Sequence, residues 1–353
     1  MPVNTSRTTY REHTDTENIL KLRQVLSTLP AFCKDYFRAI DSTTTTKTRI
    51  SYAYDIRIFF QFLLDENPAF KNYAMTDFSV AVLDQIKAVD LEEYMEYLKV
   101  YQNGDKTETN GERGLKRKIS ALRSFYAYYK REMIHTNPTV LIDVPKIHDK
   151  SIIRLDTDEV ALLLDYIEHC GDSLTGQKRV YYEKTKERDL AIVTLLLGTG
   201  IRVSECVGLD IEDVDFKNNG IKVTRKGGNE MVVYFGEEVE KALKHYLEIR
   251  EGITPLAGHE HALFYSAQRK RMGVQAVENM VKKYSRQITT TKKITPHKLR
   301  STYGTALYQE TGDIYLVADV LGHKDVNTTK KHYAALDDAR RRQAATAVRL
   351  RED

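Results

Sequence analysis

The chain has 353 residues, of which 41% are hydrophobic and 29% are charged, and its formal net charge at pH 7 is only +4. That length is enough for two separate hydrophobic cores, and the small net charge does not by itself indicate a polyanionic ligand. The longest apolar run, from Leu190, is shorter than the roughly 20 residues that span a bilayer, and Cys33, Cys170 and Cys206 are too few and too widely spaced for a disulfide framework or a zinc site.

The first part of the chain shows apolar residues at helical spacing. The segments 17–29, 48–67 and 90–102 follow this pattern and are predicted to be helices. A fourth helix is predicted over 115–133, and its apolar stripe consists of Leu115, Ile119, Leu122, Tyr126, Tyr129 and Met133. Between Glu112 and Arg131 there are seven basic residues and one acidic residue. The basic side is either a solvated face or a phosphate-contacting face, for which the candidates are Lys116, Arg117, Lys118 and Arg123.

A segment with two prolines, 135–151, is predicted to be an extended linker. Beyond it the sequence predicts an amphipathic helix over 155–167 and a buried helix over 188–198. The alternation in 219–235 indicates a β-hairpin with Lys226 at its turn, and 261–266 is predicted to be a further short strand. We therefore expect four parts: a polar tail (1–17), a helical domain (18–144), a mainly helical domain with a small antiparallel sheet (145–335) and a C-terminal tail (336–353).

Positive charge is concentrated between Arg269 and Arg300, where ten lysines or arginines accompany one acidic residue, Glu278. So one-sided a segment is stronger evidence for a polyanion-binding surface than the charge of the whole chain. The candidate DNA contacts in it are Arg269, Lys270, Arg271, Lys282, Lys283, Arg286, Lys292, Lys293 and Lys298.

The second half of the chain also contains the side chains that phosphodiester cleavage without a metal requires. Charge that develops on the non-bridging oxygens is best held by planar guanidinium groups, while a nucleophile attacks in line and a proton reaches the leaving oxygen. The available residues are Arg202, Lys226, His297, Arg300, His323 and Tyr333.

The surrounding motifs resemble the tyrosine recombinase family, which includes phage and transposon integrases and the Xer recombinases. The likeness covers about Thr46 to Ala335. Its specific part consists of the first arginine box, "GTGIRVSECVGLDIEDVDF" at 198–216, the His-x-x-Arg box, "HKLRSTYGTAL" at 297–307, and the Gly-His and tyrosine box, "VADVLGHKDVNTTKKHYA" at 317–334. Each box alone is weak, but the three in this order form a strong signal.

The resemblance implies a two-domain clamp, with a helical core-binding domain and an α+β catalytic domain. It implies that Tyr333 attacks the scissile phosphate, forming a 3′-phosphotyrosine bond and releasing a 5′-hydroxyl. Arg202 and Arg300 would clamp the non-bridging oxygens, and Glu205 would orient Arg202.

Further implied roles concern protons and hydrogen bonds. His297 would act as general base or hydrogen-bond partner, His323 would donate a hydrogen bond to the phosphate, and Lys226 would protonate the departing 5′ oxygen. Because the phosphotyrosine bond retains the phosphodiester energy, no metal, ATP or other cofactor is implied.

The spacing of the last box differs from the family pattern. Tyr333 lies ten residues after His323, one more than is usual, which on a continuous helix rotates the tyrosine by about 100°. We therefore expect a bulge or an early helix end within 328–333.

The expected partners are double-stranded DNA with paired recombination sites and further copies of the chain, as a tetramer in which the tail 336–353 docks on a neighbour. An accessory protein is a further possible partner, no membrane is involved, and the expected location is the cytoplasm. Alternative functions are a type IB topoisomerase, a non-catalytic DNA-binding regulator and a metal-dependent nuclease. The last would need acidic ligands near His297 and His323, and the sequence shows no recognisable ligand spacing there.

Overall fold

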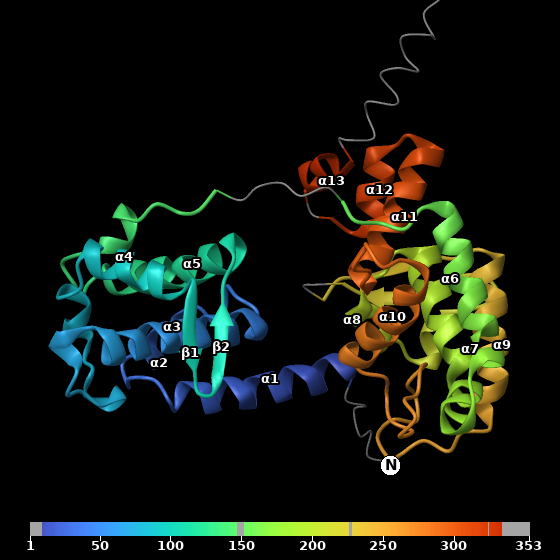
Figure 1. Cartoon of the computed structure of the whole chain (residues 1–353), viewed down its shortest axis with the longest axis horizontal. Helices are drawn as coiled ribbons and strands as arrows, with labels where there is room; N and C mark the ends of the chain where they lie inside the picture. Colours follow the sequence, from blue (N-terminus) through green and yellow to red (C-terminus); the bar gives the residue numbers. More distant parts are fainter. Residues whose placement is uncertain (1–8, 147–151, 226–227, 324, 334–353) are drawn as a thin grey trace, which may run out of the picture. The chain divides into compact units, whose positions relative to one another are not determined.

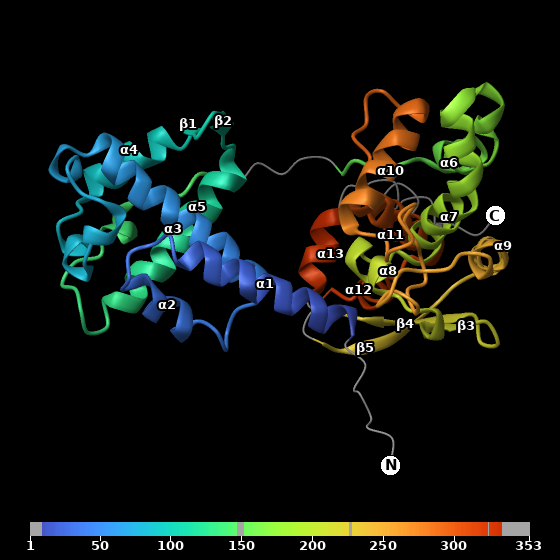
Figure 2. The same cartoon turned by 90° about the horizontal axis from the view of Figure 1, so that it is seen from below.

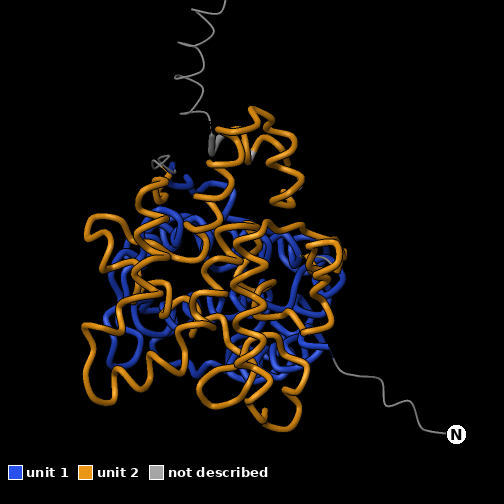
Figure 3. Tube along the Cα trace, turned by 90° about the vertical axis from the view of Figure 1, so that its right-hand side faces the viewer, with its two compact units in different colours: residues 1–149 blue, residues 150–353 orange. Residues whose placement is uncertain are grey.

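The computed structural model describes residues 9–146, 152–225, 228–323 and 325–333. The chain divides into two compact units, Met1–Asp149 and Lys150–Asp353, which Figure 3 colours separately. Both are mainly helical and each contains one small antiparallel sheet, which confirms the expected fold class. Within the described ranges, no helix is long and apolar enough to cross a membrane.

The described part of unit 1, residues 9–146, contains five α-helices and a β-hairpin (Figure 1). These elements are α1 (Tyr10–Leu26), α2 (Cys33–Ala39), α3 (Thr46–Glu66), α4 (Ala88–Tyr97), β1 (Val100–Asn103), β2 (Lys106–Thr109) and α5 (Glu112–Tyr129). Short 3-10 helices are η1 (Pro68–Phe70), η2 (Met75–Asp77), η3 (Val80–Asp84) and η4 (Pro138–Leu141). α3 packs against both α1 and α5, so the apolar faces of these three helices form the core.

Aromatic rings dominate that core. The ring of Phe125 on α5 lies 5.2 Å from that of Tyr36 and 5.0 Å from that of Tyr129, both in edge-on geometry. Such pairs add stability beyond the area they bury. The predicted apolar stripe of α5 is buried as far as Tyr129, but Met133 is 52% exposed because the helix ends before it.

Two boundaries in unit 1 differ from those predicted. α1 begins at Tyr10, inside the expected polar tail, and its start is fixed by a reciprocal capping box between Thr9 and Glu12. The helix predicted over 90–102 ends at Tyr97 as α4, and β1 and β2 follow as a hairpin. Its turn contains Gly104 with φ of +63°, a conformation that favours glycine.

In unit 2 the long helix α7 packs against α6, α9 and α11. Its α-helices are α6 (Thr157–His169), α7 (Gly176–Thr199), α8 (Val203–Gly208), α9 (Glu237–Glu251), α10 (Val274–Ile288), α11 (Pro296–Thr311), α12 (Ile314–Leu321) and α13 (Val326–Tyr333). The strands are β3 (Val214–Asp215), β4 (Gly220–Thr224) and β5 (Glu230–Tyr234), and the 3-10 helices are η5 (Cys170–Ser173) and η6 (Ile211–Asp213). The sheet has the order β3-β4-β5 (Figure 2). Ile221 on β4 lies opposite Val233 on β5.

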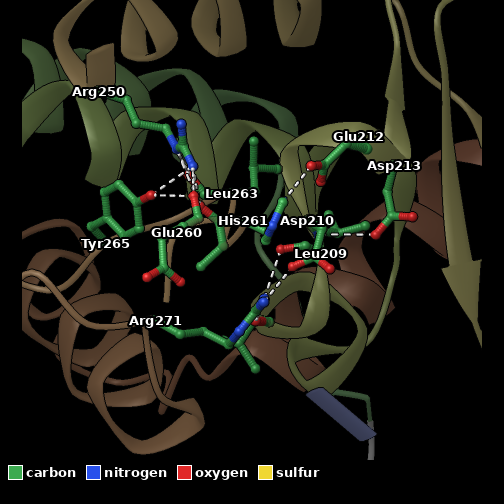
Figure 4. Close-up of polar contacts among 12 residues, drawn as sticks. Leu209, Asp210, Glu212, Asp213, Arg250, Glu260, His261, Leu263, Tyr265 and Arg271 are labelled. Carbon is green, nitrogen blue, oxygen red and sulfur yellow. Dashed lines mark hydrogen bonds and ion pairs between the residues drawn. The ribbon is translucent and has the colours of Figure 1, made fainter. Parts of the chain in front are cut away.

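The strand predicted over 261–266 is wrong. This segment forms only isolated bridges, through Ala262 and Tyr265. Its carbonyls are used differently, because the guanidinium of the buried Arg250 donates to the carbonyls of both Ala262 and Leu263 at 3.1 Å (Figure 4). A side chain therefore satisfies backbone groups that a neighbouring strand would otherwise have bonded.

Candidate active site

Arg202 lies where α7 gives way to α8. α7 ends at Gly200, whose φ of +62° reverses the chain, and a Cβ there would lie only 2.4 Å from the ring of Tyr303. Arg202 is the N-cap residue of α8, and its backbone N–H donates to Oε2 of Glu205 at 2.8 Å. Its guanidinium donates to the other oxygen of that carboxylate at 2.7 Å. Glu205 is buried, so one carboxylate holds both the backbone and the side chain of Arg202.

Arg300 approaches the same place from α11. It is 3% exposed, and its Nη1 donates to the carbonyl of Gly200 at 2.6 Å while Nη2 donates to the carbonyl of Leu321. Arg202 donates through Nη2 to the next carbonyl, that of Gly322, at 3.2 Å. The two guanidinium groups therefore converge on consecutive carbonyls at the C-terminus of α12, where the helix dipole favours positive charge.

His323 follows directly. Gly322, with φ of +61°, ends α12, and the backbone N–H of His323 donates to the carbonyl of Ala318 at 2.9 Å. The His323 Nδ1 lies 2.7 Å from Oγ1 of Thr329 on α13. Thr329 is fully buried. Thr329 lies within the Gly-His and tyrosine box, but the sequence assigned it no role. The contact links the imidazole to the helix that carries Tyr333.

The remaining predicted site residues are placed to different extents. His297 is an exposed residue in the first turn of α11, three residues before Arg300 and thus on the same side of that helix. Lys226 lies outside the described residues. Tyr333 belongs to α13, which runs without interruption from Val326 to Tyr333. The bulge or early helix end predicted within 328–333 is therefore wrong, because 326–333 form one uninterrupted helix.

Part of the expected DNA-binding face of α5 faces the core instead. Lys118 is 3% exposed, and its Nζ donates to Oδ1 of the buried Asp55 at 3.1 Å. Arg117 forms an ion pair with the other oxygen of Asp55 but remains 46% exposed. Burial raises the pKa of Asp55, and the charges of Lys118 and Arg117 oppose that shift. The prediction of a DNA contact is therefore wrong for Lys118, whose ammonium is used to neutralise a buried carboxylate.

Three further predicted DNA contacts have structural partners. Arg123 donates to the carbonyls of Thr139 at 3.2 Å and Ile142 at 2.6 Å. Arg271 is only 13% exposed; it donates to the carbonyls of Val207 and Leu209 at the end of α8 and forms an ion pair with Asp210 (Figure 4). Lys292 forms ion pairs with Asp156 and Glu159 at the start of α6. These cations contact segments of their own unit, and their assignment as DNA contacts stays a prediction.

The other candidates remain accessible. Lys298 is half-buried, and the exposed ones are Lys116, Arg117, Arg269, Lys270, Lys282, Lys283, Arg286 and Lys293. Three of these lie on the outer side of α10, whose opposite side buries Val277 and Val281. Their role in DNA binding stays a prediction.

Lys116 and Lys118 on α5 allow a matched comparison between an exposed lysine and a buried one. We expect Lys118→Ala to destabilise unit 1 by about 3 kcal/mol, because it leaves Asp55 buried with one cation fewer. Lys116→Ala should leave the free energy of unfolding unchanged and weaken DNA binding. The slope of log affinity against log salt concentration should become shallower by about one. Thermal unfolding and fluorescence anisotropy across a salt series measure both effects. A folded, fully stable Lys118→Ala protein with the reduced salt slope would contradict the assignment.

Comparison with known proteins places these features in context. The model of the phage integrase family matches residues 154–340. Tyrosine recombinase XerC of Caldanaerobacter subterraneus subsp. tengcongensis is 32% identical over 90% of this chain and 86% of its own length. Tyrosine recombinase XerS of Streptococcus uberis is 30% identical over 90% of this chain and 95% of its own.

Solved structures share the fold. The XerH site-specific recombinase bound to palindromic difH substrate, in a post-cleavage complex, gives a TM-score of 0.65 at 20% identity and covers 97% of this chain and 90% of its own. The Tn1549 transposon integrase in complex with circular intermediate DNA gives a TM-score of 0.62 at 23% identity, over 88% of this chain and 98% of its own.

Proposed function

Because this chain belongs to the phage integrase family and is a tyrosine site-specific recombinase, we propose that it cleaves and rejoins DNA through a 3′-phosphotyrosine bond to Tyr333. The hydroxyl of Tyr333 gives its proton to a general base, for which His297 is the candidate, as its oxygen attacks the scissile phosphorus and the bond to the 5′ oxygen breaks. That oxygen leaves with a proton supplied by Lys226. The 5′-hydroxyl of a partner strand then attacks the phosphotyrosine and releases the tyrosine, so the exchange consumes neither ATP nor a metal-bound water.

The observation that carries this proposal is the convergence of Arg202 and Arg300 beside His323. Their guanidinium groups contact the carbonyls of Gly322 and Leu321, which immediately precede the imidazole. Planar, permanently charged donors suit the two non-bridging oxygens of a phosphate, and they stabilise the charge that grows on these oxygens in the transition state. Glu205 keeps Arg202 oriented before DNA arrives.

The groups around this clamp take the roles that the family resemblance implies. His323, held by Thr329, donates a hydrogen bond to the phosphate, and His297 acts as base or hydrogen-bond partner of the same group. The proposed chemistry requires no metal ion. Among the described residues, no group of three or more histidine, cysteine or acidic side chains could hold a metal ion.

The proposed substrate is double-stranded DNA with paired recombination sites, bound by a tetramer. The helical residues 18–144 and the catalytic residues 145–335 act as two halves of a clamp, and the tail 336–353, outside the described residues, docks on a neighbouring copy. Recruitment of an accessory protein is part of the same proposal. XerH and Tn1549 integrase, which share this fold, have both been solved bound to DNA.

Trapping of the covalent intermediate tests the proposed chemistry. Wild type and Tyr333→Phe are incubated in EDTA with a nicked library of genomic and element-end DNA, in which a short 5′ fragment diffuses away after cleavage. We expect a protein–DNA adduct on a denaturing gel for wild type only, and sequencing of the attached DNA identifies the site. An adduct with Tyr333→Phe, or one that needs a divalent metal, would contradict the proposal.

A further inference from the structure

Arg225 is a buried arginine at the end of the β4–β5 hairpin, next to Lys226. It is 8% exposed, whereas Lys222 on the same hairpin has a side chain that is 52% exposed. The guanidinium of Arg225 leaves the hairpin and reaches α12. Nη1 donates to the carbonyl of Leu321 at 2.6 Å and Nη2 to that of Val320 at 2.7 Å. Its fork therefore spans two consecutive carbonyls in the last turn of a helix.

The contacts of Arg225 show that its guanidinium is not simply a solvated surface group. Among the described residues, its other partner is the thioether of Met231, 2.8 Å from Nε, and none of its bonded partners is a carboxylate. Burial lowers the pKa of Arg225, and the more distant Glu205 opposes that shift. Burying a cation in this way costs free energy, which the negative end of the α12 dipole partly offsets. The geometry is specific to arginine, because an ammonium group cannot place two coplanar donors on two carbonyls.

Arg202 and Arg300, the proposed phosphate clamp, bond to the same turn. The carbonyl of Leu321 accepts from both Arg225 and Arg300, and the next carbonyl, that of Gly322, accepts from Arg202. Gly322 also lies directly against Arg225, since a Cβ added to it would be 2.2 Å from the Arg225 Nη1. His323 is the next residue. A shift of Arg225 therefore displaces the backbone on which both arginines of the clamp rest.

We propose that Arg225 is a positioning residue, which fixes the turn 320–323 and thereby sets the places of Arg300 and His323 at the scissile phosphate. This inference rests on the proposed function. Arg225 acts through the turn and does not touch DNA, so it controls the rate of cleavage and not the affinity for DNA.

The test compares Arg225→Ala and Arg225→Lys with wild type and with the matched hairpin control Lys222→Ala. Single-turnover cleavage is measured at saturating protein and at a temperature where circular dichroism shows every variant folded. The substrates are the recombination site with its normal 5′ oxygen and the same site with a 5′ sulfur at the scissile phosphate, a leaving group that needs no proton. We expect both Arg225 variants to cleave about a hundredfold more slowly on both substrates, because a displacement of about 1 Å costs that much. DNA affinity and its salt dependence stay at the wild-type values, and Lys222→Ala cleaves normally.

A second variant keeps the inference testable if Arg225→Ala folds poorly. Gly322→Ala places a methyl group against the Arg225 guanidinium and should slow cleavage to a similar degree. In the double variant with Arg225→Ala and Gly322→Ala, the second substitution should slow cleavage by no more than a further few fold, because both changes disrupt one contact.

Three outcomes would overturn the role of Arg225: wild-type rates for Arg225→Lys, full rescue by the sulfur substrate, or multiplicative losses in the double variant. Absence of an adduct from wild type itself would instead overturn the proposed function.

Discussion

Replacement of Arg300 by alanine should abolish strand cleavage while DNA binding persists. Arg300 is almost fully buried and its guanidinium reaches the carbonyls of Gly200 and Leu321, so it lies at the centre of the candidate site. Loss of one preorganised donor to developing charge typically slows an enzyme by 10²–10³-fold, and a permanently charged, buried guanidinium belongs at the upper end of that range (about 10³). Binding depends on the sum of many phosphate contacts and should change little.

Two controls separate this effect from loss of structure. Arg300→Lys retains the charge but not the planar fork, so it should remain at least about a hundredfold slower than wild type. Arg269→Ala removes an exposed arginine and should affect only affinity. The measurement is single-turnover formation of the phosphotyrosine adduct. Thermal unfolding is followed in parallel, since the Gly200 carbonyl loses the Arg300 donor and the Leu321 carbonyl keeps only that of Arg225. Cleavage by folded Arg300→Ala at a rate near that of wild type would remove Arg300 from the proposed clamp.

Periodicity in the sequence predicts the helices well where one face is buried. The segment 48–67 corresponds to α3 and 115–133 to α5, because apolar residues that recur every three or four positions pack against a core on one side. The β4–β5 hairpin follows from its alternation. The β1–β2 hairpin was missed although Asn103-Gly104 is a strong turn signal, because the apolar pattern of α4 extends into Val100 and Tyr101.

The sequence does not reveal the contacts of buried charged residues. Lys118 and Arg271 belong to strongly basic segments, yet each is turned inward toward a carboxylate, Asp55 or Asp210. The partners are far apart along the chain, so no local pattern announces them. Composition therefore locates basic segments but does not show which of their cations are paired with carboxylates of the same unit.

The candidate site likewise contains residues that the sequence identifies and residues that it does not. Three motifs identify Arg202, Arg300 and His323 in sequence, and the structure brings them to one turn at the end of α12. The sequence gives Arg225 and Thr329 no role, although Thr329 lies within the tyrosine box, because their contacts with that turn and with the imidazole appear only in the fold. Residues that position a site are chosen by packing geometry, which only the fold defines.

The largest expected effect on stability comes from a buried network within unit 2. Asp189 on α7 is 2% exposed and accepts from Arg188 Nε at 2.9 Å and Nη2 at 2.6 Å, and from the hydroxyl of Tyr284 on α10 at 3.0 Å. Arg188 also donates to the carbonyl of Tyr265 at 3.0 Å. Both charges are removed from water, so each relies on the other and on these hydrogen bonds.

Asp189→Ala should therefore lower the free energy of unfolding of unit 2 by about 3–5 kcal/mol, since Arg188 remains buried without its counter-charge. Tyr284→Phe is the matched control; it removes one hydrogen bond and should cost about 1 kcal/mol. The chain has no tryptophan, so hydrogen exchange with mass spectrometry in urea is the suitable measurement, and it reports the two units separately.

Peptides from α7 and α10 should lose protection in Asp189→Ala while those from α3 keep it. Equal protection of α7 and α10 in the two variants would show that the ion pair contributes little. The consequence for function follows from the position of α7, which ends at the Gly200 carbonyl that holds Arg300. Cleavage by Asp189→Ala should consequently match wild type at low temperature, where unit 2 is still folded, and be lost on warming in step with the exchange of α7.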